Sequence, residues 1–179
     1  MRVLLILLLL CLLWLPAATA SAQSNQLPRA VTSILDTKYP GWRFSLVNDE
    51  VRRFFKERFP SARPNLISGD FDGNGKTDYA VLIEHTNFDK TGKAFTHVVE
   101  TLAFLRKGRG YKLYVLRESQ PADLEFYLTL ARKGEEGSDF RTEKKYRYPN
   151  DSISISYFEK AGGTYIYDRG KFRYVLESD

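Results

Sequence analysis

The feature that most constrains this chain is a run of acidic residues and glycines that leads directly into an apolar segment. Residues 69–83 read GDFDGNGKTDYAVLI, and oxygen-bearing side chains recur at Asp70, Asp72, Asn74 and Asp78. Glycine tolerates a left-handed backbone at little steric cost, so Gly73 and Gly75 allow the chain to curl between these side chains. Residues 79–84 are β-branched and aromatic enough to favour a strand. The run therefore predicts a tight loop that feeds a strand.

The spacing of the oxygens in this loop suits a hard cation. Ca²⁺ takes about six to eight oxygen ligands, and a curled loop directs every second side chain inward. We predict one Ca²⁺, held by Asp70, Asp72, Asn74, the carbonyl of Lys76, and Asp78. The alternative is a turn that binds nothing, because Asp, Asn and Gly are favoured in turns anyway. Three carboxylates would, however, repel one another without a cation.

An EF-hand fits this loop only partly. Counted from Asp70, the twelfth position is Val81, where an EF-hand needs a bidentate glutamate. The spacing D-x-D-x-[DN]-G-x-x-D resembles instead the calcium loop of FG-GAP and VCBS-type repeats, in which the loop leads into an apolar strand. That resemblance covers residues 69–83 and implies the same five ligands. Propellers built on this motif repeat it in every blade, whereas it occurs once here, so we predict that the chain is not a propeller.

The first 22 residues have the features of an export signal. Arg2 precedes an apolar run from Val3 to Leu15, and Ala20-Ser21-Ala22 is a small-residue cleavage motif. The run has 13 residues, fewer than the roughly 20 that span a bilayer. We therefore predict a cleaved signal peptide at 1–22, no stable membrane anchor, and a secreted or periplasmic protein.

The rest of the chain is predicted to form a loose tail at 23–27 and a single domain at 28–179. The one cysteine, Cys11, lies in the signal, so the exported chain is expected to use neither disulfides nor thiol chemistry. The formal net charge of the whole chain is +5 and is dispersed. Such a mild excess does not favour nucleic acid as a partner.

The apolar pattern changes along this domain. Residues 31–39 and 51–59 carry apolar side chains on one helical face, and a proline follows each segment. Later segments show strand patterns and glycine turns, at 80–84, 96–106, 111–117, 152–157, 164–167 and 171–176. Residues 124–131 alternate like a strand, with a helix left open, and 134–145 predict a mobile loop. The expected fold class is α+β, with two N-terminal amphipathic helices followed by an antiparallel β meander.

Two further pairs of residues are candidates for chemistry. His85 and His97 end one predicted strand and begin the next, so they could approach each other, with Asp89 in the loop between. Two unrelated strand histidines are the simpler interpretation, because a metal site needs a third ligand. Glu84 and Glu100 could form a carboxylate pair of the kind that glycosidases use, although chance proximity explains them as well.

Two surface features could meet a partner. A basic cluster on the second helix could contact anionic lipid or an acidic protein, or could simply be a solvated face; it comprises Arg52, Arg53, Lys56, Arg58 and Arg63. Aromatic residues of the last strands could form an outward strip that binds sugar or peptide, or could pair across strands; they are Tyr157, Phe158, Tyr165, Tyr167, Phe172 and Tyr174.

These patterns favour a binding module over an enzyme. The sequence contains no G-x-S-x-G elbow, no H-E-x-x-H motif and no phosphate-binding glycine loop. We therefore expect an exported, non-enzymatic domain with one structural Ca²⁺ and a surface that binds a protein or a glycan. The alternatives are an envelope hydrolase that uses metal or paired carboxylates, and a structural or inhibitor protein with an ion-stapled loop.

Overall fold

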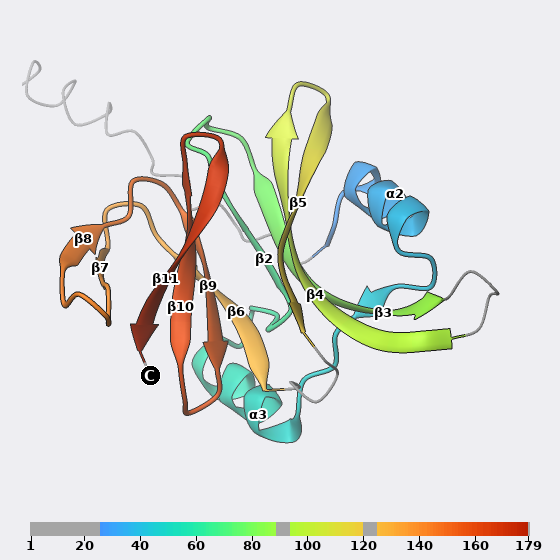
Figure 1. Ribbon diagram of the computed structural model, residues 1–179, viewed down its shortest axis with the longest axis horizontal. Helices are drawn as coiled ribbons and strands as arrows, with labels where there is room; N and C mark the ends of the chain where they lie inside the picture. Colours follow the sequence, from blue (N-terminus) through green and yellow to red (C-terminus); the bar gives the residue numbers. More distant parts are fainter. Residues whose placement is uncertain (1–25, 89–93, 120–124, 179) are drawn as a thin grey trace, which may run out of the picture.

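The computed structural model describes residues 26–88, 94–119 and 125–178 (Figure 1). About half of these residues lie in strands and 15% in helices. The predicted signal peptide, most of the predicted tail, Asp89 and Leu124 lie outside the described residues. No helix in the described part of the chain combines the length and the apolar character needed to cross a bilayer.

The described helices are both ten residues long. Helix α2 spans Arg29–Lys38 and helix α3 spans Asp49–Arg58. Each buries two side chains four positions apart, which places them on one face; these are Val31 and Leu35 in α2, and Val51 and Phe55 in α3. Asn48 caps the N-terminus of α3, because its side chain accepts a hydrogen bond from the Val51 N–H at 2.9 Å.

The first sheet is antiparallel and carries the acidic loop. Its strands follow the order β1 (Arg43–Phe44), β3 (Asp78–Phe88), β4 (Ala94–Lys107) and β5 (Gly110–Ser119). Strand β2 (Leu66–Gly69) also pairs with β3. The predicted hairpin between residues 96–106 and 111–117 is confirmed, because β4 pairs with β5 across a tight turn.

The second sheet contains the C-terminal strands. Its order is β11 (Lys171–Ser178), β10 (Gly162–Asp168), β9 (Ser152–Tyr157) and β6 (Phe126–Ala131). Residues 124–131, for which both a strand and a helix were considered, therefore contain a strand, β6. The prediction of a mobile loop over 134–145 was wrong, because strands β7 (Glu136–Ser138) and β8 (Lys145–Arg147) pair there as a small separate sheet.

The predicted α+β class was wrong: the described chain is mostly β, with two short helices and three sheets. A single meander was expected because consecutive strands pair, and they do so within each of the two larger sheets. The strands β3 and β4, however, bury both of their faces. Ala80 and Leu82 point into a core shared with the second sheet, whereas Val81 and Ile83 point into a core under α2. Two apolar faces require two covering layers, so the chain folds into stacked layers.

The layers are arranged around the interface between the two sheets. Figure 1 shows α2 beside the sheet of β3, β4 and β5, and α3 at the lower end of β6 and β9. The rings of Phe54 and Phe55 pack on Tyr127, at 5.7 and 5.4 Å between centroids, so α3 rests on β6. The β7–β8 hairpin covers another part of the second sheet, where Tyr146 and Tyr148 pack with Ile166.

Candidate metal centre

The acidic loop joins β2 to β3. Gly69 and Asp78 are register partners in these antiparallel strands, so the loop begins and ends at neighbouring positions. Gly73 and Gly75 adopt φ angles of 72° and 76°, in the left-handed region that glycine enters without strain. The curl predicted from the glycine spacing is therefore present in the structure.

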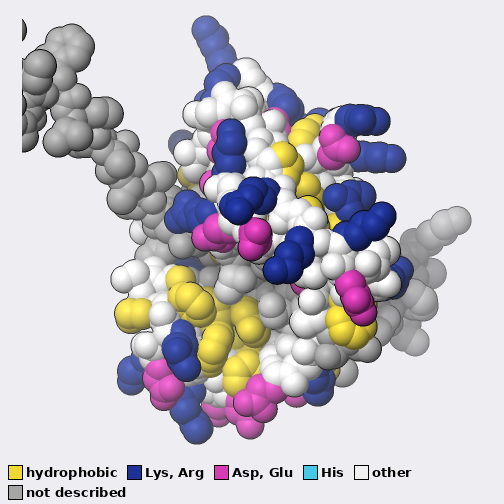
Figure 2. All heavy atoms as spheres, turned by 90° about the vertical axis from the view of Figure 1, so that its left-hand side faces the viewer, with side chains coloured by type: hydrophobic (Ala, Val, Ile, Leu, Met, Phe, Trp, Pro, Cys, Tyr) yellow, Lys and Arg dark blue, Asp and Glu magenta, His cyan; other side chains and the backbone are white. Residues whose placement is uncertain are grey.

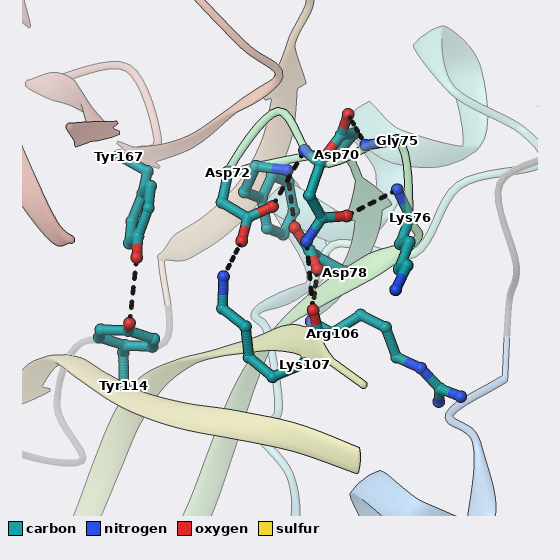
Figure 3. A network of polar contacts seen from close by, with 11 residues as sticks. Asp70, Asp72, Gly75, Lys76, Asp78, Arg106, Lys107, Tyr114 and Tyr167 are labelled. Carbon is teal, nitrogen blue, oxygen red and sulfur yellow. Dashed lines mark hydrogen bonds and ion pairs between the residues drawn. The ribbon is translucent and has the colours of Figure 1, made fainter. Parts of the chain in front are cut away.

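Three predicted acids converge inside this loop. Asp70, Asp72 and Asp78 each present a carboxylate oxygen, and these oxygens lie within 4.8 Å of one another (Figure 3). Asp78 is fully buried, the side chain of Asp72 is almost completely buried, and Asp70 is half-buried. Because several carboxylate oxygens in such a cluster suit a hard cation, this group could hold a metal ion.

Backbone N–H groups fix the carboxylate of Asp70. Its Oδ1 accepts a hydrogen bond from the N–H of Asn74 at 2.9 Å, and its Oδ2 accepts one from the N–H of Gly75 at 2.8 Å. The Asn74 N–H also reaches Asp72 Oδ1 at 3.2 Å. These bonds hold the loop curled around its acids, and each carboxylate oxygen retains a lone pair for a cation.

Asp78 ties the loop to the end of β4. Its Oδ2 accepts a hydrogen bond from the Phe71 N–H at 2.9 Å, and its Oδ1 accepts one from the Arg106 N–H at 2.7 Å. Burial raises the pKa of Asp78 from 3.8 to about 6, because removing the carboxylate from water outweighs the two N–H bonds that lower the pKa. A cation beside Asp78 would offset this cost of burying its charge.

Lys107 supplies a positive charge that the sequence did not indicate. Its ammonium donates a hydrogen bond to Asp72 Oδ2, and Figure 3 shows it reaching the loop from the end of β4. The side chain of Asp72 is 2% exposed, whereas that of Lys107 is 48% exposed. This hydrogen bond raises the pKa of Lys107 above its ordinary value. The ammonium therefore neutralises one carboxylate of the cluster.

The two other predicted ligands lie in the same loop. Asn74 Oδ1 accepts a hydrogen bond from the Lys76 N–H at 2.9 Å, and its Nδ2 donates to the Arg106 carbonyl at 3.1 Å. Lys76 is exposed. Coordination of an ion by the Asn74 amide oxygen and by the Lys76 carbonyl remains a prediction.

The turn before β9 supports the loop from the second sheet. Asp151 Oδ2 accepts a hydrogen bond from the Asp70 N–H at 3.2 Å, and Asp151 Oδ1 accepts one from the Lys133 N–H at 3.1 Å. A Cβ atom on Gly73 would lie 2.4 Å from Asn150 Oδ1, so a larger residue would force Asn150 to move. Nothing in the local spacing of residues 69–83 points to this contact, because its partners come from the other sheet.

The candidate histidine pair is not formed, in keeping with the simpler interpretation of two unrelated strand histidines. His85 is the register partner of Val98, and His97 that of Thr86, so the two imidazoles point to opposite faces of the sheet. His85 Nε2 lies 2.9 Å from Glu100 Oε1, and it is buried under α2. His97 is half-exposed on the other face.

The candidate carboxylate pair is not formed either. Glu100 is the register partner of Ile83, so Glu84 projects from the opposite face. Glu84 is 3% exposed and forms an ion pair with Arg43. Glu84 and Glu100 therefore cannot act together on one glycosidic bond.

Four members of the basic cluster lie on α3, and the fifth lies beyond this helix. Arg52, Arg53, Lys56 and Arg58 are exposed on α3, and Arg52 pairs with Asp49 at 2.8 Å. Arg63 lies beyond this helix, with its guanidinium 4.6 Å from the Phe44 ring centroid. On the face drawn in Figure 2, lysine and arginine side chains are interspersed with acidic ones, and hydrophobic side chains gather low, at the height of α3.

The terminal aromatic residues mostly pair across strands on the inner face of the second sheet. Tyr165 and Tyr174 have ring centroids 4.9 Å apart, and Tyr167 and Phe172 have theirs 5.1 Å apart. Tyr165 is 8% exposed, and Tyr174 at the sheet edge is 42% exposed. These four rings therefore stabilise the sheet and its core, in place of an outward strip.

Comparisons with protein-family models, curated proteins and solved structures found no match to this chain. The function is therefore argued from the geometry of its own residues.

Proposed function

We propose that residues 70–78 bind one Ca²⁺ as a solitary loop of the FG-GAP and VCBS type, in an exported, non-enzymatic binding module. The observation that carries the proposal is the convergence of the Asp70, Asp72 and Asp78 carboxylates within 4.8 Å in a loop curled by two left-handed glycines. The ligand set is completed by Asn74 Oδ1, the Lys76 carbonyl and water.

Calcium suits this ligand set better than magnesium does. Ca²⁺ accepts irregular arrangements of oxygens at about 2.3–2.6 Å, whereas Mg²⁺ demands near-octahedral geometry at about 2.0–2.1 Å and keeps several waters. A loop that offers five oxygens from flexible side chains and a carbonyl matches the first requirement. Free calcium is also abundant outside cells, so even a loop of modest affinity stays loaded there.

The ion acts as a staple at one end of the first sheet. Asp78 begins β3 and binds the Arg106 N–H of β4, while Asp70 is held by Asp151 next to the second sheet. A cation shared by these acids links β2, β3 and β4 to each other and offsets the repulsion among the buried carboxylates. The loop thus stabilises the domain, and other parts of its surface bind the partner, a protein or a glycan.

Thermal unfolding with and without calcium tests the metal site. An ion that binds only the folded state at 100 times its Kd adds about 2.7 kcal/mol, which corresponds to a rise in Tm of roughly 5–10 °C for a domain of this size. Asp72→Ala should abolish the rise, because it removes a side-chain ligand. Lys76→Ala is the matched control and should preserve it, because Lys76 contributes only its carbonyl. Equal Tm values in millimolar calcium and in chelator would refute the proposal, and an equal rise with magnesium would refute the choice of ion.

A further inference from the structure

A pocket that is lined by residues of both sheets lies away from the metal centre. It has a volume of about 420 Å³ and combines Arg117 of β5 with residues of the second sheet and its β9–β10 turn; its lining includes Phe126, Ile155, Tyr157, Lys160 and Tyr174. Ligand sites in proteins commonly measure about 300–1,000 Å³ and are mostly apolar with a few placed polar groups. This pocket has both properties.

The floor of the pocket is aromatic and rigid. Phe126 is 6% exposed and meets Tyr157 edge to face, with ring centroids 4.8 Å apart. Ile155 is fully packed beneath them, and Tyr174 forms a more exposed wall. Because Phe126 and Ile155 are buried, the surface open to a flat apolar body comes mainly from the half-buried Tyr157 and the exposed Tyr174.

Two cations stand over this floor. The Arg117 guanidinium carbon lies 4.3 Å from the centroid of Phe126, and the Lys160 ammonium lies 4.3 Å from the centroid of Tyr157. Lys160 is paired with Glu125 at 2.9 Å. Arg117 forms no ion pair with any residue of the described ranges. Among the described residues, the pocket therefore contains a guanidinium that forms no ion pair and is stacked on an apolar ring.

We propose that this pocket binds a small organic anion with a flat apolar body. The carboxylate, sulfonate or phosphate of the ligand pairs with the Arg117 guanidinium, whose planar fork suits oxyanions. The apolar body lies along Tyr157 and Tyr174, next to the Arg117 guanidinium that covers Phe126. A cationic ligand is disfavoured by Arg117 and Lys160. This site shares no lining residue with the acidic loop, so it does not depend on the proposed calcium site.

Two fluorescent probes that differ in one group test the proposal on the full chain. They are 8-anilinonaphthalene-1-sulfonate and N-phenyl-1-naphthylamine, which share the arylamine skeleton but differ in the sulfonate. We expect saturable binding of the sulfonate at one site, at least about tenfold tighter than binding of the neutral probe. Arg117→Gln should weaken sulfonate binding by about tenfold and change neutral binding less than twofold. Arg173→Gln is the matched control, because it removes an exposed arginine next to Tyr174 that does not line the pocket.

The titrations are run in calcium and in chelator, beside thermal unfolding of each variant. Equal affinity for the two probes in the wild type, or an unchanged sulfonate affinity in Arg117→Gln, would overturn the proposal. If Arg117→Gln unfolds, Lys160→Gln replaces it, since that side chain is 60% exposed and its loss leaves the core intact. Lys160→Gln should then weaken sulfonate binding by about threefold, and an unchanged affinity would count against the pocket.

Discussion

Replacing Lys107 with methionine should tighten calcium binding while it destabilises the ion-free protein. In the ion-free state the ammonium is the cation that contacts the buried carboxylate of Asp72. A hydrogen bond to a charged group contributes about 1.5–3 kcal/mol, but the 48% exposure of the Lys107 side chain screens it, so we take about 1 kcal/mol. With calcium bound, the ion neutralises Asp72, and the loss of the ammonium costs little.

Calcium binding and the substitution form a thermodynamic cycle. Because Lys107→Met destabilises the ion-free protein by about 1 kcal/mol but hardly changes the calcium-bound protein, it should tighten calcium binding about fivefold. Isothermal titration calorimetry at fixed ionic strength measures it. In chelator, the same variant should melt about 2–4 °C lower than the wild type. Lys133→Met is the matched control, because it removes an exposed lysine whose backbone, but not side chain, contacts Asp151. An affinity that is unchanged or weaker in Lys107→Met would refute the role of Lys107 as an internal counter-ion.

Two further predictions concern how the loop and the hairpin are held. Gly73→Ala should destabilise the protein by about 2 kcal/mol or more, and Gly75→Ala by about 1 kcal/mol, because both have positive φ but only Gly73 lies against Asn150. Equal losses of stability in urea would contradict the packing of the loop on that turn. Glu177→Ala should cost about 2–3 kcal/mol, since this carboxylate accepts hydrogen bonds from three hydroxyls, including that of Tyr148. A loss below about 0.5 kcal/mol in the same assay would show that Glu177 does not fasten the β7–β8 hairpin.

The strands were easier to predict than their arrangement. The hairpin of β4 and β5 follows from the Gly108-Arg109-Gly110 turn between two apolar runs, and the three C-terminal strands follow from alternation and glycine turns. The division into separate sheets did not follow. Residues 79–83 are apolar at every position, and periodicity alone does not assign odd and even residues to two different cores.

The two candidate pairs of side chains also could not be placed from sequence spacing alone. His85 with His97, and Glu84 with Glu100, were considered because they are close in a hairpin. The register decided both cases, since a one-residue offset in pairing places side chains on opposite faces. That register depends on which face packs under α2, and this cannot be read from the spacing of four residues.

The sequence by itself determined the local geometry of the acidic loop. Alternating acids and glycines specify which side chains turn inward, because backbone preference acts over a few residues, and Asp70, Asp72 and Asp78 do converge. Only the tertiary structure decided which side chains contact this loop and which side chains line the pocket that contains Arg117. Lys107, Asp151 and Arg117 reach their partners through strand pairing and the packing of one sheet on the other. Such contacts join residues far apart in the chain, and they are selected by burial of apolar faces, which no short motif records.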